Sequence, residues 1–244
     1  MKKYLIFIPV FNEEQNVKEV LFLIKRYRNM SDILVIDDGS TDNTSTILDT
    51  IKGINKIRHK SNKGYGFTLI EGFNYAIEQN YQYVITMDSD KQHQPKEVEK
   101  FIKMNEKSDF DILSGSRYLN ANNNNDSKAP EDRRKVNQRV TKKINNFTGY
   151  DLTDAFCGFK LYKTHSLKKL KLDEPGYGMP LQLWVQAWKN NLTVKEIPVE
   201  LIYLDRNKGT VNAYKNLFRR YRYYMEIINK GKMYYENISS RSAS

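Results

Sequence analysis

Short apolar runs alternate with amphipathic stretches along the first half of the chain. The runs near residues 4–10, 33–36, 54–58, 81–87 and 112–115 are rich in β-branched and aromatic residues, as buried strands are. The stretches between them show helical periodicity and end near residues 24, 51, 77 and 104. This alternation predicts β-α-β units and an α/β fold with a mostly parallel central sheet flanked by helices.

Asn12 is expected to cap the first helix, with Gln15 in the position of a capping box. The second half adds a helix near 136–147, a strand near 159–162, a helix near 181–188 and a return to the sheet within 194–204. One domain, residues 1–211, holds all these elements.

Residues 212–244 form a separate unit, because apolar and aromatic side chains recur there at helical spacing beside a basic stripe. The stripe consists of Lys215, Arg219 and Arg222. Such a helix suits the interface of an anionic membrane, and it equally suits packing of its apolar face on the domain. Residues 236–244 are expected to form a frayed tail.

The charge balance narrows the possible partners. The chain has 40 Lys and Arg and 29 Asp and Glu, which give a net charge of +11. This charge favours binding to nucleic acid, anionic lipid or phosphorylated substrates. No apolar run reaches the roughly 18 residues needed to span a bilayer, and the apolar start is expected to be a strand rather than a signal peptide. The single cysteine, Cys157, allows no intrachain disulfide, which suits a cytoplasmic location.

Asp88-Ser89-Asp90 ends the fourth apolar run. Because side chains alternate along a strand, Asp88 and Asp90 can face the same way while Ser89 faces the other. Ligands bind at strand ends in open α/β sheets, where two carboxylates can share a hard cation with substrate phosphates. The sequence therefore predicts a Mg²⁺ or Mn²⁺ site for a diphosphate, with Gln92 as a neutral oxygen ligand, although a solvated turn has the same composition.

Other strand ends supply groups for a nucleotide sugar. The loops that begin at Pro9 and Ile36 carry acidic groups that can accept hydrogen bonds from ribose or a base edge. Arg117 follows the fifth run and can bind phosphate through two N–H groups.

Six motifs occur in one order: P-V-F-N-E, D-D-G-S-T-D, M-D-S-D-K-Q-H, G-S-R-Y, D-A-F-C-G-F and E-I-P-V-E-L-I-Y-L-D-R-N-K-G. Over about residues 4–209 the chain thereby resembles inverting glycosyltransferases of family 2 with the GT-A fold, above all those that act on dolichyl or polyprenyl phosphate. The resemblance implies a nucleotide-binding set, a metal set and a phosphate-binding set. The nucleotide-binding set is Pro9, Phe11, Glu13, Ile36, Asp38 and Ser89. The metal set is Asp88, Asp90 and Gln92. The phosphate-binding set is Arg117, Arg133, Arg134 and Arg206.

The implied reaction moves a hexose from a GDP-mannose or UDP-glucose type of donor, with inversion. A lipid phosphate acceptor needs no strong base, whereas a sugar hydroxyl in polysaccharide or glycolipid synthesis does, and Asp154 is then the candidate. The implied location is the cytoplasmic face of a membrane, as a peripheral protein, with an anionic membrane surface and a separate membrane-anchoring protein as further partners.

The chain departs from the family at three positions. Gln182 stands where an acid is common, and Val211 and Asn212 replace the serine and lysine of R-x-x-G-x-S-K. These positions concern the acceptor and phosphate side, so they bear on the acceptor more than on the reaction class.

Three other functions fit less well. Gly64, Gly66 and Gly72 do not form the G-x-G-x-x-G of a dinucleotide-binding fold, and a phospho-receiver domain is about half this length. A nucleic-acid-binding module would use the basic charge and the aromatic residues from Tyr214 onward. The carboxylates at the strand ends would repel its phosphates, so no nucleic-acid partner is expected.

Overall fold

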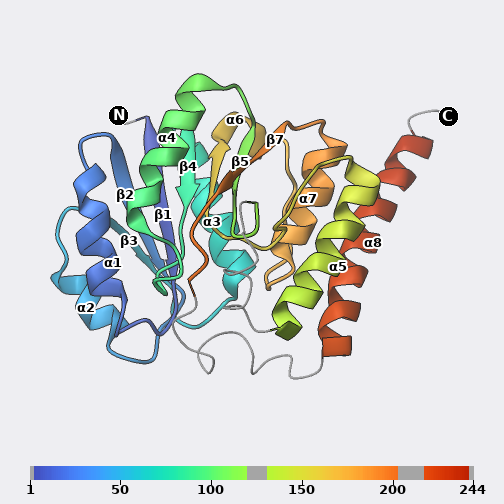
Figure 1. The fold of residues 1–244 in the computed structure, drawn as a ribbon. Coiled ribbons are helices and arrows are strands. Elements are labelled where there is room, and N and C mark those ends of the chain that lie inside the picture. Colours follow the sequence, from blue (N-terminus) through green and yellow to red (C-terminus); the bar gives the residue numbers. More distant parts are fainter. Residues whose placement is uncertain (1–2, 120–130, 203–216, 242–244) are drawn as a thin grey trace.

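The computed structural model describes residues 3–119, 131–202 and 217–241, and in these ranges the chain forms one seven-stranded, mostly parallel sheet (Figure 1). The strand order is β3-β2-β1-β4-β6-β5-β7. Only β6 runs antiparallel to its neighbours, β4 and β5. The strands are β1 (Tyr4–Val10), β2 (Ser31–Asp37), β3 (Asn55–Arg58), β4 (Tyr83–Thr86), β5 (Ile112–Ser116), β6 (Lys160–Lys163) and β7 (Val194–Pro198).

Helices cover both faces of the sheet, because its central strands are apolar on both sides. In β1, Leu5 and Phe7 belong to the buried cluster that also holds residues of α3, α5, α7 and α8, whereas Ile6 and Ile8 belong to the cluster that holds residues of α1, α2 and α4. The helices are α1 (Val17–Ile24), α2 (Thr44–Thr50), α3 (Tyr65–Glu78), α4 (Val98–Lys107), α5 (Glu131–Thr148), α6 (Thr164–Leu167), α7 (Met179–Lys189) and α8 (Leu217–Arg241). Short 3₁₀ turns at Lys25–Tyr27 and Pro95–Glu97 extend α1 and precede α4.

The predicted α/β class is confirmed, and β1 has the predicted bounds. The expected helix cap at Asn12 is wrong, since α1 begins at Val17 and Asn16 occupies its N-cap position. Asn12 instead adopts a positive φ of 55°. Its N–H donates to Ser40 Oγ at 2.9 Å and its Oδ1 accepts from the Thr41 N–H at 2.8 Å, so it joins the loops after β1 and β2.

The C-terminal helix packs on the domain. Tyr224, Ile227 and Ile228 of α8 are buried in the cluster that also contains residues of α5 and α7, while Phe218 at its start is 70% exposed. The helix continues to Arg241, so the expected frayed tail from residue 236 is wrong as far as that residue. Among the described residues, no helix is both long and apolar enough to cross a bilayer.

Candidate active site

The site lies at the carboxyl ends of the parallel strands, where the loops after β1, β2 and β4 are hydrogen-bonded to one another. The Asp38 N–H donates to the Val10 carbonyl at 2.8 Å, and Ser89 Oγ donates to the Pro9 carbonyl at 3.4 Å. β4 ends at Thr86, so the Asp88-Ser89-Asp90 segment lies in the following loop, and strand alternation does not orient it as expected.

Asp88 is the partly exposed carboxylate at the centre of this loop, with its side chain 30% accessible. Its Oδ1 accepts a hydrogen bond from the Tyr65 hydroxyl at 3.2 Å. A Cβ on Gly158 would come within 2.6 Å of Asp88 Oδ2, so only glycine lets this backbone approach the carboxylate. Burial raises the pKa of Asp88, and the Tyr65 hydroxyl and the charges of Lys160 and Arg117 oppose the rise.

Asp90 carries the second carboxylate. Burial raises its pKa, and the nearby negative charge of Asp88 raises it further. Gln92 donates its backbone N–H to Asp90 Oδ1 at 3.0 Å and its side-chain Nε2 to Oδ2 at 2.7 Å. The amide oxygen of Gln92 is thereby left for another partner.

This donor set fits a hard divalent cation. Burial disfavours both carboxylates in their charged form, and the charge of Asp88 adds to this for Asp90, so a positive ion would stabilise both. Oxygen ligands are those that Mg²⁺ and Mn²⁺ prefer. Within the described ranges, no group of three or more His, Cys, Asp and Glu side chains could hold a metal ion alone. A cation held by Asp88 and Asp90 would therefore need further oxygens from substrate phosphates and water.

His93 lies beneath the two carboxylates and is 4% exposed. Its Nδ1 accepts the backbone N–H of Asp88 at 3.0 Å, so a neutral ring carries its proton on Nε2. Burial lowers the pKa of His93 to about 4. His93 therefore serves as a neutral support for the Asp88 backbone.

Arg117 and Asp154 form a buried bidentate ion pair. Arg117 Nε donates to Asp154 Oδ2 at 2.6 Å and Nη2 donates to Oδ1 at 2.9 Å. Asn137 Nδ2, from α5, also donates to Oδ1 at 2.7 Å. Although burial favours the neutral acid, Arg117 and then Asn137 lower the pKa of Asp154 to about 2.

This pairing corrects the expected role of Asp154. A carboxylate that is 0% exposed and has a pKa near 2 does not accept a proton from a substrate hydroxyl. Asp154 instead fixes Arg117 through two of the guanidinium N–H groups. The Arg117 side chain is 15% exposed.

Glu196 of β7 anchors the loop that carries Asp154. Its Oε2 accepts from the Thr153 N–H at 2.8 Å, and its Oε1 accepts from the Asp154 N–H at 3.0 Å. Lys160 of β6 is buried below the same loop and donates to the Cys157 carbonyl. Burial lowers the pKa of Lys160, while the charges of Asp154 and Asp88 oppose that shift.

On the predicted nucleotide side, Asp38 is buried and already hydrogen-bonded. Its carboxylate accepts from the backbone N–H groups of Lys63 at 2.8 Å and Gly64 at 2.9 Å, and its Oδ1 lies 2.6 Å from His59 Nδ1. His59 Nε2 faces Glu71 on α3. In this structure Asp38 holds the loop before α3 instead of offering oxygens to a ligand.

The other predicted nucleotide residues divide into exposed and buried ones. Phe11 is 43% exposed and Glu13 is half-buried. Ile36 is fully buried against residues of α3, so its side chain does not line an open pocket, contrary to the expectation. Pro9 and Ser89 are also buried, so each can contribute to a nucleotide site only through its backbone or by shaping its loop.

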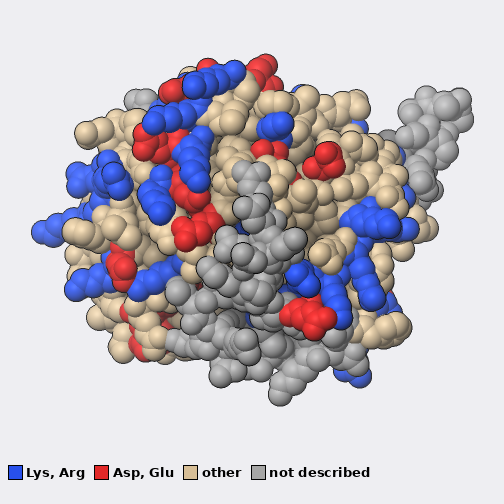
Figure 2. Space-filling view, in the orientation of Figure 1, with Lys and Arg blue, Asp and Glu red and all other residues tan. Residues whose placement is uncertain are grey.

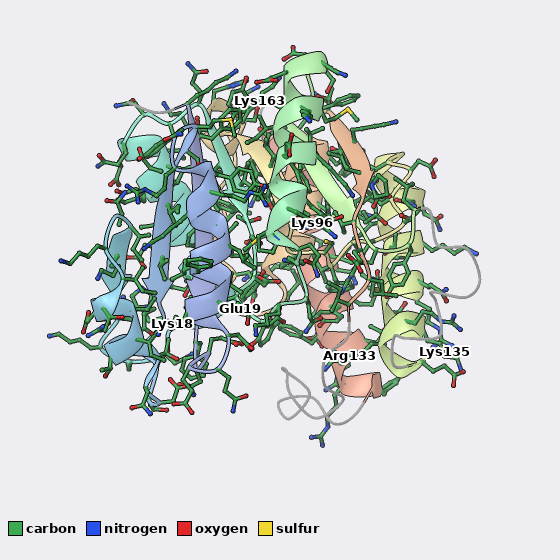
Figure 3. The ribbon with its side chains drawn as sticks, turned by 60° about the vertical axis from the view of Figure 1, so that its left-hand side comes forward. Lys18, Glu19, Lys96, Arg133, Lys135 and Lys163 are labelled. Atoms are coloured by element: carbon green, nitrogen blue, oxygen red, sulfur yellow. The ribbon has the colours of Figure 1, made fainter. Side chains whose placement is uncertain are left out.

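The predicted phosphate-binding residues lie in different places. Arg133 and Arg134 are half-buried in the first turn of α5, which begins at the same end of the sheet as the Asp88 loop (Figures 1 and 3). Arg206, Val211 and Asn212 lie outside the described residues.

Gln182 has a structural explanation. Its Oε1 accepts the backbone N–H groups of Asp173 and Glu174, both at 3.0 Å, and its Nε2 donates to the Asp173 carboxylate. An acid could make the first two contacts but not the third. The neutral amide therefore matches the local Asp173.

Several residues of the site were not predicted from the sequence. His93 ends the M-D-S-D-K-Q-H motif, which was the available signal for it. Tyr65 is the first residue of α3, and only its position after β3 could have indicated it. Asn137 and Lys160 reach the site from distant elements, and their sequence context gave no signal of it. Glu196 opens the last of the six motifs, which was the available signal for it.

The sequence of this chain is similar to a known protein family and to several known proteins. The profile of the family described as "Glycosyl transferase family 2" matches residues 5–171. An uncharacterised protein of Methanocaldococcus jannaschii is 31% identical over 231 residues, covering 88% of this chain and 89% of that protein. The UDP-N-acetylglucosamine–dolichyl-phosphate N-acetylglucosaminyltransferase of Methanococcus voltae is 29% identical, covering 88% and 93%.

Two further comparisons concern sugar transfer. The polyprenol monophosphomannose synthase of Mycolicibacterium smegmatis is 27% identical over 207 residues, covering 81% of this chain and 77% of that protein. Glucosyl-3-phosphoglycerate synthase of Mycobacterium tuberculosis, solved with Mn²⁺, UDP and phosphoglyceric acid, has a TM-score of 0.72 at 14% identity and covers 94% and 78%. This structural likeness shows the shared fold.

The buried ion pair leads to a stability prediction. Asp154→Asn should lower the free energy of unfolding by about 3 kcal/mol at pH 7, because it leaves the buried Arg117 charge without its partner. The pKa of Asp154 is lowered from an ordinary value of 3.8 to about 2, so its contribution is present above about pH 4 and is lost as the pH falls towards 2. The difference from wild type should therefore shrink on acidification.

Denaturant unfolding followed by circular dichroism between pH 7 and pH 3 measures this difference. Asp151→Asn, an exposed change in the same loop, serves as the control and should unfold like wild type. A pH-independent gap between Asp154→Asn and wild type would contradict the assigned pairing.

Proposed function

Because the chain belongs to glycosyltransferase family 2 and is a glycosyltransferase, we propose that it moves a hexose from a nucleotide-diphosphate sugar to a polyprenyl or dolichyl phosphate. Relatives named for transfer to dolichyl and polyprenyl phosphates, each covered over most of its length, support this acceptor. The donor is proposed to be of the GDP-mannose or UDP-glucose type.

The single observation that carries the proposal is the Asp88–Asp90 pair at the carboxyl ends of the parallel strands. Asp88, Asp90 and the amide oxygen of Gln92 would hold Mg²⁺ or Mn²⁺. When bound, such a cation neutralises charge that develops on the diphosphate leaving group. Phe11 and Glu13, in the neighbouring loop after β1, are the accessible residues proposed to contact the nucleoside.

The acceptor follows from the state of the potential bases. A lipid phosphate brings an oxygen that is already anionic near neutral pH, so its attack on the anomeric carbon requires no proton removal. A sugar hydroxyl requires a base, but Asp154 is buried and paired with Arg117. His93 accepts from the Asp88 N–H and is equally occupied. These contacts favour the lipid phosphate over the hydroxyl.

Arg117 would orient a phosphate through the N–H groups that Asp154 does not use. Arg133 and Arg134, at the start of α5, are proposed to assist on the acceptor side. Arg206 keeps the phosphate-binding role that its motif implies.

The start of α8 is proposed to meet the membrane on its cytoplasmic face. Phe218, Arg219 and Arg222 are exposed there, while the apolar residues of the middle of the helix pack on the domain. Figure 2 shows Lys and Arg side chains over α5 and α8, with another group over α1 and α4. An exposed aromatic ring beside cations suits the headgroup region of an anionic bilayer.

A panel of nucleotide sugars with Mn²⁺ or Mg²⁺ tests the proposed reaction. Release of nucleoside diphosphate should depend on a polyprenyl phosphate and on the metal, and one donor should also raise the thermal midpoint. Release that is equal with and without the lipid would refute the acceptor, and activity in excess chelator would refute the metal.

Asp90→Ala should reduce sugar transfer at least about 100-fold, because it removes one of the two carboxylates proposed to hold the cation. Its thermal midpoint should stay near the wild-type value, since Asp90 is partly exposed. Initial rates and thermal melts of Asp90→Ala and of the exposed control Asp151→Ala measure both effects. Wild-type activity in Asp90→Ala would refute the metal assignment.

Changing both Arg219 and Arg222 to Glu should release the protein from liposomes that contain anionic lipid, because attraction becomes repulsion at the proposed contact. Cosedimentation at fixed salt gives the bound fraction. Lys168→Glu with Lys230→Glu makes the same change in net charge at other exposed positions and should bind nearly as wild type. Equal loss in both double variants would mean that binding follows net charge alone.

A further inference from the structure

The Asp88 carboxylate is held by a side chain that belongs to a chain of contacts leading to α8. Tyr65 donates its hydroxyl to Asp88 Oδ1 at 3.2 Å. Its ring stacks on that of Tyr177, with centroids 5.5 Å apart and an interplanar angle of 18°. Tyr65 thus bridges the site and the loop of residues 173–178, here called the brace loop.

The backbone of the brace loop packs directly against the backbone at the start of α3. The Phe67 N–H donates to the Pro175 carbonyl at 3.0 Å. A Cβ added to Gly64 would lie 2.4 Å from that same carbonyl oxygen, and one added to Gly66 would lie 2.2 Å from the Glu174 carbonyl oxygen. Such backbone contact means that a shift of the brace loop must also move the start of α3.

On its other side the brace loop is fixed to α8. Tyr223 donates its hydroxyl to Glu174 Oε1 at 2.6 Å, and the same oxygen accepts the Gly176 N–H at 3.0 Å. A Cβ on Gly178 would clash with Ile227 of α8 at 1.9 Å. One carboxylate oxygen therefore ties the brace loop to α8 and closes its turn.

We propose that Tyr65 is a positioning residue for Asp88, and that α8 sets its position through Glu174 and the brace loop. The inference rests on the proposed function, because Asp88 is there a metal ligand. A ligand carboxylate held by a hydrogen bond keeps one orientation, and loss of such a partner typically weakens metal binding. The link also joins the exposed start of α8, with Phe218 and Arg219, to the donor site.

The test measures Mn²⁺ binding with UDP from the electron paramagnetic resonance signal of free Mn²⁺. Tyr65→Phe removes one hydroxyl and should weaken Mn²⁺ binding about tenfold with the thermal midpoint little changed. Tyr75 is a half-buried tyrosine of the same helix, so Tyr75→Phe is the matched control and should bind Mn²⁺ as wild type does. Equal or tighter Mn²⁺ binding by Tyr65→Phe would overturn the assignment.

The link to α8 is tested by a double-mutant cycle. Tyr223→Phe should weaken Mn²⁺ binding about threefold, and the Tyr65→Phe/Tyr223→Phe double variant should bind no more weakly than Tyr65→Phe alone. Tyr221→Phe, on the same helix, controls for changes in α8. Losses that multiply would overturn the link, whereas a wild-type protein that takes up no Mn²⁺ with any nucleotide would overturn both this inference and the proposed metal site.

Discussion

The buried pair of Arg117 and Asp154 is the interaction on which the site depends. Two charges taken out of water are costly unless each finds a full set of partners, and here the guanidinium binds through two donors while Asn137 completes the carboxylate. The pair joins the end of β5 to the loop before β6 and to α5. Glu196 then fixes the same loop from β7. An ion pair of this kind orders four elements around Arg117, the group proposed to bind phosphate.

The surroundings divide the site carboxylates into two kinds. Asp154 lies against a cation and has a low pKa, whereas burial raises the pKa values of Asp88 and Asp90, and the charge of Asp88 raises that of Asp90 further. The first is committed to structure, and the other two gain most from an added positive charge. Environment thereby separates carboxylates that look alike in the sequence, and this separation supports the proposed metal-assisted departure of a diphosphate over acid–base catalysis.

The sequence predicted what local pattern determines. The continuous apolar run near residues 4–10 predicted the bounds of β1 correctly. The alternation of strand and helix patterns predicted the sheet and the loops at the carboxyl ends of its strands. It could not reveal that β6 runs antiparallel, which brings Lys160 beneath the site. Nor could it show that Asn12 bonds to a loop 29 residues away in preference to capping a helix. Contacts between distant segments decide such details.

The exchange at Gln182 illustrates how a departure from a family pattern can be local. The two backbone N–H groups that it accepts would suit a carboxylate equally well, but Asp173 lies on the other side of the amide. A second acid there would place two negative charges in contact, at a cost that the neutral amide avoids by donating to Asp173. The brace loop can then keep its position against Tyr65. A change that at first suggests a different acceptor is therefore explained by its immediate neighbour, and it does not argue against a lipid phosphate.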